Sequence, residues 1–149
     1  STMIQSVLDE GGMVDKIMGD TVMSLFGVLP TTEKAPVHAI DAAIKMIEAV
    51  KELSKVKPEK ECCTFDTGIG IASGSVSLGI IGSKNDKTFV AVGQYVNLAQ
   101  RLGLQARPRE ILIDENTFNS LGKQNYFSMS TVVETGIVKP IRIYSYLVT

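Results

Sequence analysis

The chain of 149 residues has little of what several common enzyme classes need. It has a single histidine, His38, and two cysteines, Cys62 and Cys63, which are neighbours in the sequence. Because His38 falls early in a predicted helix with no partner nearby in the sequence, Ser-His-Asp and Cys-His chemistry are excluded. Adjacent cysteines rarely pair with each other, since the geometry is strained. We interpret Cys62 and Cys63 as reduced thiols rather than as a disulfide or a metal site.

Basic residues are not in excess either, because 15 Lys and Arg face 16 Asp and Glu, for a net charge of -1. This balance excludes DNA or RNA as a partner. No apolar run approaches the length of a membrane span, and the short basic runs do not favour membrane-surface binding. We also expect no signal peptide. We expect a cytoplasmic segment without direct membrane contact, in a protein that is wholly cytoplasmic or the cytoplasmic part of a larger, membrane-anchored one.

The composition predicts one globular domain over residues 1–149. Hydrophobic residues make up 44% of the chain and charged residues 21%, which suits a folded protein with a sizeable core. The chain begins with Ser1 rather than Met, and residues 1–10 already resemble the later part of an amphipathic helix. We therefore expect a processed chain or a fragment of a longer protein.

The order of the predicted elements indicates an α+β fold in which helices pack on a mixed sheet. Gly19-Asp20 predicts a hairpin turn between the first two strands, and Gly74 a turn between the third and fourth. Apolar spacing predicts helices over residues 1–10, 35–55, 93–104 and 114–121. Strands are predicted over residues 13–18, 21–26, 65–72, 75–81, 88–92, 110–113, 127–133 and 141–147.

Glycines punctuate the central strands at positions 68, 70, 74 and 79. Their spacing follows neither the dinucleotide-binding nor the Walker pattern, and no helix follows them directly. We interpret them as positions of tight packing within the sheet and as a turn.

Two polar residues of the first hairpin are candidates for a functional site. Asp20 lies at the predicted tip, where an exposed carboxylate on a stiff frame suits a hard cation such as Mg²⁺. An ordinary turn aspartate is the alternative, since Asp tolerates turn geometry. Lys16 lies within an otherwise apolar strand, where it can donate to a ring nitrogen or a phosphate, or can simply face solvent.

The helix that follows Gly93 carries a second polar pair, Asn97 and Arg101. These residues are four apart and therefore share one face of the helix. Arginine offers a permanent charge and a planar fork that matches phosphate oxygens. The spacing predicts either a phosphate-binding pair beside a buried stripe or an ordinary exposed polar pair.

Together, these segments resemble the class III nucleotide cyclases, the adenylate and guanylate cyclase catalytic domains. The resemblance covers about three quarters of the chain and implies a ferredoxin-like sandwich whose first β-strand is missing from the chain. The matching segments are residues 11–20 (GGMVDKIMGD), 68–74 (GIGIASG), 79–83 (GIIGS), 92–102 (VGQYVNLAQRL) and 110–113 (EILI).

The resemblance also implies a reaction and a site. The ribose 3′-hydroxyl of ATP, favoured over GTP, would attack the α-phosphate and release pyrophosphate, in intracellular signalling. Two Mg²⁺ or Mn²⁺ ions would assist, at a site shared by a homodimer or pseudo-dimer. Asp20 would bind metal, and would act with Lys16, Asn97 and Arg101 of the other subunit. Lys16 would contact the purine, Asn97 would orient the ribose, and Arg101 would stabilise charge at the phosphate.

Two positions and a missing strand depart from the family's pattern. Val90 occupies the place of a polar purine-reading residue and offers no side-chain hydrogen bond. Thr135 occupies the place of a phosphate-binding lysine, for which Lys139 could substitute if the loop is shifted. Since the missing strand would carry a second metal-binding aspartate, we expect activity only in the intact parent protein. The alternative is a degenerate, non-catalytic module for dimerisation or nucleotide sensing.

Overall fold

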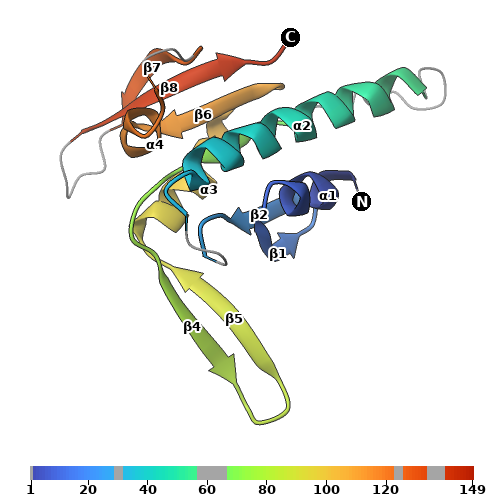
Figure 1. Ribbon diagram of the computed structural model, residues 1–149, viewed down its shortest axis with the longest axis vertical. Coiled ribbons are helices and arrows are strands. Elements are labelled where there is room, and N and C mark those ends of the chain that lie inside the picture. Colours follow the sequence, from blue (N-terminus) through green and yellow to red (C-terminus); the bar gives the residue numbers. More distant parts are fainter. Residues whose placement is uncertain (1, 29–31, 57–66, 123–125, 134–139) are drawn as a thin grey trace.

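The computed structural model describes residues 2–28, 32–56, 67–122, 126–133 and 140–149 (Figure 1). Thr135, Lys139 and both cysteines lie outside the described residues, so their predicted roles stay predictions. The predicted helices are confirmed, with small differences at their ends. They are α1 (Thr2–Asp9), α2 (Ala35–Val56), α3 (Gln94–Gln105) and α4 (Glu115–Asn119).

The strands of the described residues form three sheets. A four-stranded sheet has the order β3-β6-β8-β7, in which β3 and β6 are parallel and the other pairs antiparallel. This confirms the mixed sheet of the predicted α+β fold, while the hairpins β1–β2 and β4–β5 form two further sheets. The strands are β1 (Met13–Met18), β2 (Thr21–Leu25), β3 (Ile69–Ile71), β4 (Ser77–Gly82), β5 (Lys87–Val92), β6 (Glu110–Asp114), β7 (Ser128–Val133) and β8 (Ile141–Leu147).

Strand β6 is the centre of the core, because every one of its residues is buried. Its side chains alternate between the two faces of the sheet. On one face Ile111 and Ile113 join a cluster with Ile40 and Ile47 of α2. On the other face, Leu112 packs with residues of α3. Helices therefore cover both faces of the four-stranded sheet, and α3 is fixed against it.

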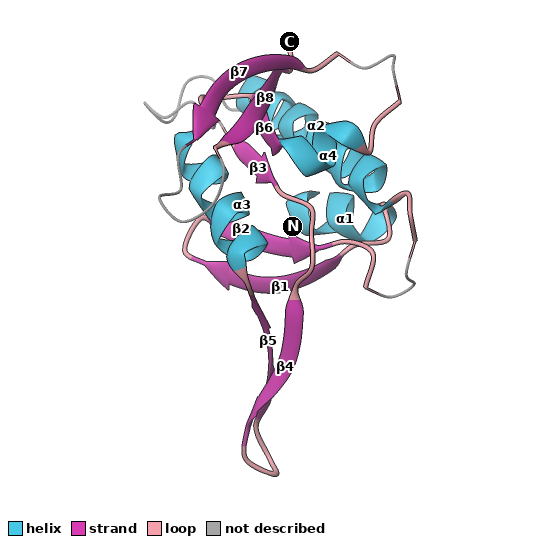
Figure 2. Cartoon of the chain, turned by 90° about the vertical axis from the view of Figure 1, so that its left-hand side faces the viewer, coloured by secondary structure: helices cyan, strands magenta, loops and turns pink. Residues whose placement is uncertain are grey.

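Helix α1 and the β1–β2 hairpin pack against α2 through a smaller cluster. Val7 of α1 meets Ala42 and Met46 of α2, and Val14 and Phe26 pack against them. In Figure 2 the hairpin lies on the same side of the molecule as α1, apart from the four-stranded sheet. The hairpin is thus attached to the core through α2.

The predicted pairing of residues 65–72 with residues 75–81 is wrong. Strand β3 pairs in parallel with β6, with Ile69 opposite Ile111, and β4 pairs with β5, with Ser77 opposite Val92. The physical reason is burial. A short apolar run between glycines has the same sequence pattern whether the strand that pairs with it is near or far along the chain. Gly74 does not form the predicted hairpin turn, and the ring of Tyr95 packs against it.

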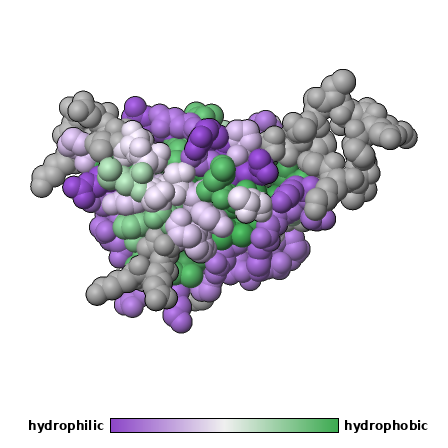
Figure 3. All heavy atoms as spheres, turned by 90° about the horizontal axis from the view of Figure 1, so that it is seen from above, coloured by the Kyte–Doolittle hydropathy of each residue, from purple (hydrophilic) through white to green (hydrophobic). Residues whose placement is uncertain are grey.

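The β4–β5 hairpin projects away from the rest of the molecule as an arm (Figures 1 and 2). Ile80 and Ile81 are 62% and 64% exposed, and because neighbours on a strand point to opposite faces, both faces of the arm are open. The end of the molecule opposite the arm is mixed: Figure 3 shows small hydrophobic areas there between hydrophilic ones. No helix of the described residues is long and apolar enough to cross a membrane.

Candidate active site

The tip of the β1–β2 hairpin presents Asp20 to solvent. Gly19 has φ 60°, the left-handed conformation that this tight turn needs and that glycine adopts without strain. The Asp20 side chain has a single weak contact among the described residues, with Thr21 Oγ1 3.5 Å from its Oδ1. Lys16 lies four residues earlier on the same hairpin, opposite Met23, and its side chain is 43% exposed. The structure therefore leaves both candidate groups accessible.

Helix α3 presents Asn97 and Arg101 together. Leu98 and Leu102 are buried against the sheet, which turns the Asn97–Arg101 face outward. Both side chains are exposed, and neither has a hydrogen bond or an ion pair within the described part of the chain. A guanidinium and an amide that are unpaired and share one face can both bind an incoming anionic or polar group.

A glycine sets how closely α3 lies on the sheet. A Cβ atom on Gly70 of β3 would lie 2.5 Å from the carbonyl oxygen of Ala99 and 2.7 Å from Leu102 Cβ. Only a residue without a side chain permits this approach. Gly70 is therefore a tight-packing position, although it packs against α3 rather than within the sheet, and it fixes the helix that carries Arg101. The same interpretation is wrong for Gly79, because a Cβ atom there would meet nothing within 4 Å.

Strand β5 lies between these two groups of residues, because it contacts both β1 and α3. Val90 is part of β5, opposite Gly79, and is half-buried. The strand thus places an apolar side chain where the resemblance implies a polar one.

The structure does not close these residues into one site. No hydrogen bond or ion pair joins Lys16, Asp20, Asn97 or Arg101 to another member of this group in the described residues. A shallow cavity of 210 Å³ lies elsewhere, lined by Val37, Ile40, Asp41, Leu121, Gly122, Tyr126 and Phe127. Ligand pockets commonly enclose about 300–1,000 Å³, so this cavity is too small for a nucleotide and contains none of the candidate residues.

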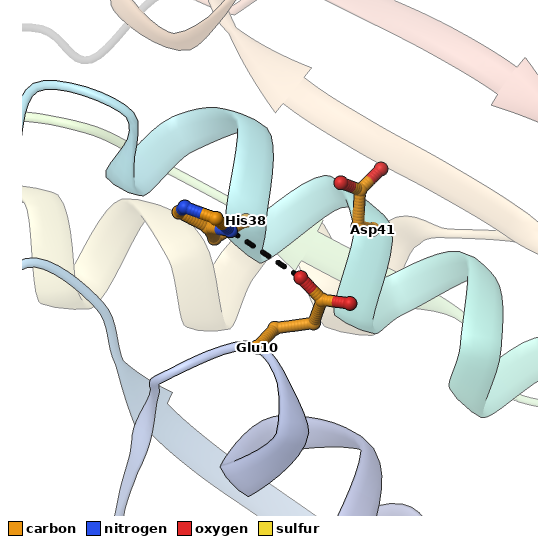
Figure 4. A group of neighbouring side chains, drawn as sticks. All are labelled: Glu10, His38 and Asp41. Carbon is orange, nitrogen blue, oxygen red and sulfur yellow. Dashed lines mark hydrogen bonds and ion pairs between the residues drawn. The ribbon is translucent and has the colours of Figure 1, made fainter.

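A second cluster, which the sequence did not predict, joins the end of α1 to α2. Ligand atoms of Glu10, His38 and Asp41 lie within 4.8 Å of one another, and Figure 4 shows His38 and Glu10 turned toward each other with Asp41 beside them. His38 Nδ1 is 3.3 Å from Glu10 Oε2, and Lys45 forms an ion pair with Glu10 Oε1. Since Glu10 already has a cationic partner, we interpret the cluster as a link between elements rather than as a metal centre.

The ionisation of this cluster follows from its contacts. The hydrogen bond from Lys45, and then that from His38, lowers the pKa of Glu10. The same hydrogen bond raises the pKa of Lys45. Both groups are thus held in their charged forms at neutral pH, as expected for an ion pair.

Comparison with known proteins decides the family. Residues 3–147 match the family described as "Adenylate and Guanylate cyclase catalytic domain". The chain belongs to this family. Among its relatives, an adenylate cyclase of Anabaena cylindrica is 32% identical over 146 residues, which cover 92% of this chain. The terminal-differentiation-specific adenylate cyclase of Dictyostelium discoideum is 31% identical over 121 residues, or 80% of this chain.

Solved cyclase structures confirm the fold. The guanylyl cyclase Cya2 has a TM-score of 0.87 at 27% identity, and the match covers 96% of this chain and 73% of that one. The adenylyl cyclase CyaB from P. aeruginosa has a TM-score of 0.84 at 28% identity, covering 96% and 75%. Adenylate and guanylate cyclases are thus both similar to this cyclase domain. The chain spans 28% of the Anabaena relative and 6% of the Dictyostelium relative.

Proposed function

We propose that this cyclase domain converts ATP, in preference to GTP, to the 3′,5′-cyclic nucleotide and pyrophosphate. The observation that carries the proposal is the pair Asn97 and Arg101, exposed together on α3 with no partner among the described residues. The Arg101 guanidinium would stabilise negative charge that develops at the α-phosphate, and the Asn97 amide would orient the ribose. Lys16 would donate to the purine, which favours adenine.

Asp20 fits one ligand position of Mg²⁺ or Mn²⁺. Its carboxylate is exposed at a fixed turn and has only the weak Thr21 contact, and such metals bind through one or two carboxylates plus substrate phosphates. Asp20 belongs to no group of three or more possible metal-ligand residues within the described part of the chain. Bound metal would lower the pKa of the attacking hydroxyl and neutralise phosphate charge. The two-metal site would be completed by residues of the intact parent protein, which is therefore the active form.

The site would be formed by two copies of the domain, as a homodimer, or by this domain and another cyclase domain. An isolated two-stranded hairpin is only marginally stable in water. The arm nevertheless exposes Leu78, Ile80, Ile81 and Val92. A second domain that packs on the arm would bury these side chains, and would bring its own Lys16, Asn97 and Arg101 to the Asp20 carboxylate of the first domain.

A non-catalytic module for dimerisation or nucleotide sensing is the second candidate. Val90 favours it, because an apolar, half-buried side chain on β5 cannot hydrogen-bond a purine. Thr135 in place of a lysine favours it as well. In that case the domain would bind a nucleotide and dimerise without turnover.

A turnover assay on the intact protein separates the two. Cyclic nucleotide formation from ATP and from GTP is measured with Mn²⁺, for the natural protein and for Asp20→Ala. The proposal expects more product from ATP than from GTP and loss of product in the variant. Equal turnover by the two proteins would eliminate Asp20 as an essential metal ligand, and no turnover by either would favour the non-catalytic module.

A further inference from the structure

Asp15, next to Lys16 in β1, has an unusual environment for a carboxylate. Its side chain is only 2% exposed. Its Oδ2 atom is buried and has no hydrogen-bond partner among the described residues. Buried charges in proteins are normally paired, because an unpaired one loses its hydration without compensation. The nearest cation is the ammonium of Lys16, whose Nζ is 4.0 Å from Asp15 Oδ2.

A β-bulge accounts for this proximity. Neighbouring residues of a regular strand point to opposite faces, so their side chains do not meet. The register of β1 and β2 shifts between Val14 and Lys16, since Val14 pairs with Ser24 and Lys16 with Met23. Asp15 is the extra residue of the bulge. Bulges redirect side chains and are common beside active sites. Here the bulge brings the carboxylate to the ammonium of the next residue.

We propose that Asp15 is a positioning residue for Lys16. Lysine has a flexible stem and three donors. The Asp15 carboxylate attracts the ammonium across 4.0 Å and limits where it lies, while the three donors stay available for the purine. This inference rests on the proposed purine contact of Lys16. Asp15 differs in this respect from Asp20, whose carboxylate is exposed and open to metal.

The arrangement predicts a dependence of one residue on the other. Without Asp15 the Lys16 side chain samples many rotamers, so ordering it on binding costs conformational entropy. Without Lys16 the Asp15 carboxylate has no purine-binding group to hold. The effects of substitutions at the two positions on the free energy of ATP binding should therefore not be additive.

The test compares Asp15→Asn, Lys16→Met and the double variant of the intact protein. The variant Glu48→Gln, which removes an exposed carboxylate of α2, is the control. ATP binding with Mn²⁺ is measured by calorimetry, and KM and kcat are measured for ATP and GTP. We expect Asp15→Asn to weaken ATP binding and raise KM about tenfold, with a smaller change in kcat and a reduced preference for ATP. We expect the double variant to match Lys16→Met, and Glu48→Gln to match the natural protein.

Two results overturn the inference and are distinct from each other. If Lys16→Met weakens ATP binding while Asp15→Asn does not, or if Asp15→Asn weakens it as much in the Lys16→Met background, Asp15 does not act through Lys16. If Lys16→Met changes neither ATP binding nor the ATP to GTP ratio, the proposed purine contact itself fails.

Thermal melting gives a readout that does not depend on nucleotide. Once Lys16 is replaced by Met, the buried Asp15 carboxylate has lost its nearest cation, so adding Asp15→Asn should raise the melting temperature of that background. In the natural background Asp15→Asn should not raise it. An equal change in both backgrounds contradicts the pairing of the two residues, even if Asp15→Asn alone folds poorly.

Discussion

On α3, the side chains that stabilise the fold differ from those proposed to act in catalysis. Leu98 and Leu102 hold the helix on the sheet, whereas the exposed side chains of Asn97 and Arg101 form no hydrogen bond or ion pair with the described residues. Substitution of an exposed side chain away from structural contacts usually changes stability little. The two polar residues can therefore be tested for catalysis without disturbing the fold.

Arg101→Ala should lower kcat about 100-fold or more, the usual effect of removing a charge-stabilising donor from a transition state. Its melting temperature should stay close to that of the natural protein. Arg101→Lys should recover part of the rate, because it restores the charge but not the planar fork. The matched control is Gln100→Ala on the same helix. Unchanged kcat in Arg101→Ala, measured by cyclic nucleotide formation, would remove Arg101 from the site.

Some features of single residues could be predicted from the sequence and others could not. The spacing of Asn97 and Arg101 predicted a shared face, because helix periodicity is local. The contact between His38 and Glu10 joins residues 28 apart in the sequence, so no local pattern predicts it. The burial of Asp15 depends on a bulge and on what packs over the hairpin, which the sequence does not encode locally either.

Between elements, the close approach of β3 and α3 decides where the polar pair lies. Gly70 has the backbone of α3 directly against it, while Gly79 on the arm has open space around its Cα. A methyl group at position 70 must push the helix away, whereas a methyl group at position 79 has room.

Gly70→Ala should therefore destabilise the fold by ~1–3 kcal/mol, the usual cost of overpacking, and should also reduce kcat as α3 shifts. Gly79→Ala is the matched control and should leave stability nearly unchanged. Urea unfolding measures both variants. Equal stability of the two would contradict the close packing of α3 on β3.

The link between Glu10 and Lys45 predicts a pH dependence. Because the folded state lowers the pKa of Glu10, the ion pair stabilises the protein above the ordinary glutamate pKa of about 4.3. That stabilisation is lost as the pH falls through the lowered value. Glu10→Gln should thus melt at a lower temperature than the natural protein at pH 7, with a difference that shrinks below pH ~4. A difference that persists unchanged in acid would show that the carboxylate charge is not responsible.

The elements themselves were largely predictable, and their partners were not. Helices α2 and α3 and the β1–β2 hairpin follow from local periodicity and a turn signal. Strand β3 pairs with β6, some forty residues later, and a buried apolar run carries no information about such a partner. The error at Gly74 arose from interpreting a packing glycine as a turn.

At the scale of the whole molecule, the candidate residues form two separate groups. Lys16 and Asp20 belong to the β1–β2 hairpin, and Asn97 and Arg101 to α3, with no bond between the groups in the described residues. The apolar arm lies exposed beside them. A site shared by two domains would account for both facts, because Asp20 of one domain would then act with Lys16, Asn97 and Arg101 of the other.

Complementation between two inactive variants tests this account most directly. Asp20→Ala and Arg101→Ala versions of the intact protein, carrying different tags, are assayed for cyclic nucleotide formation separately and after co-expression. A mixed dimer would contain one site with both substitutions and one with neither, so co-expression should restore roughly a quarter of natural activity. If the purified mixed dimer is as inactive as each variant alone, the site is not shared between two copies, and the account is contradicted.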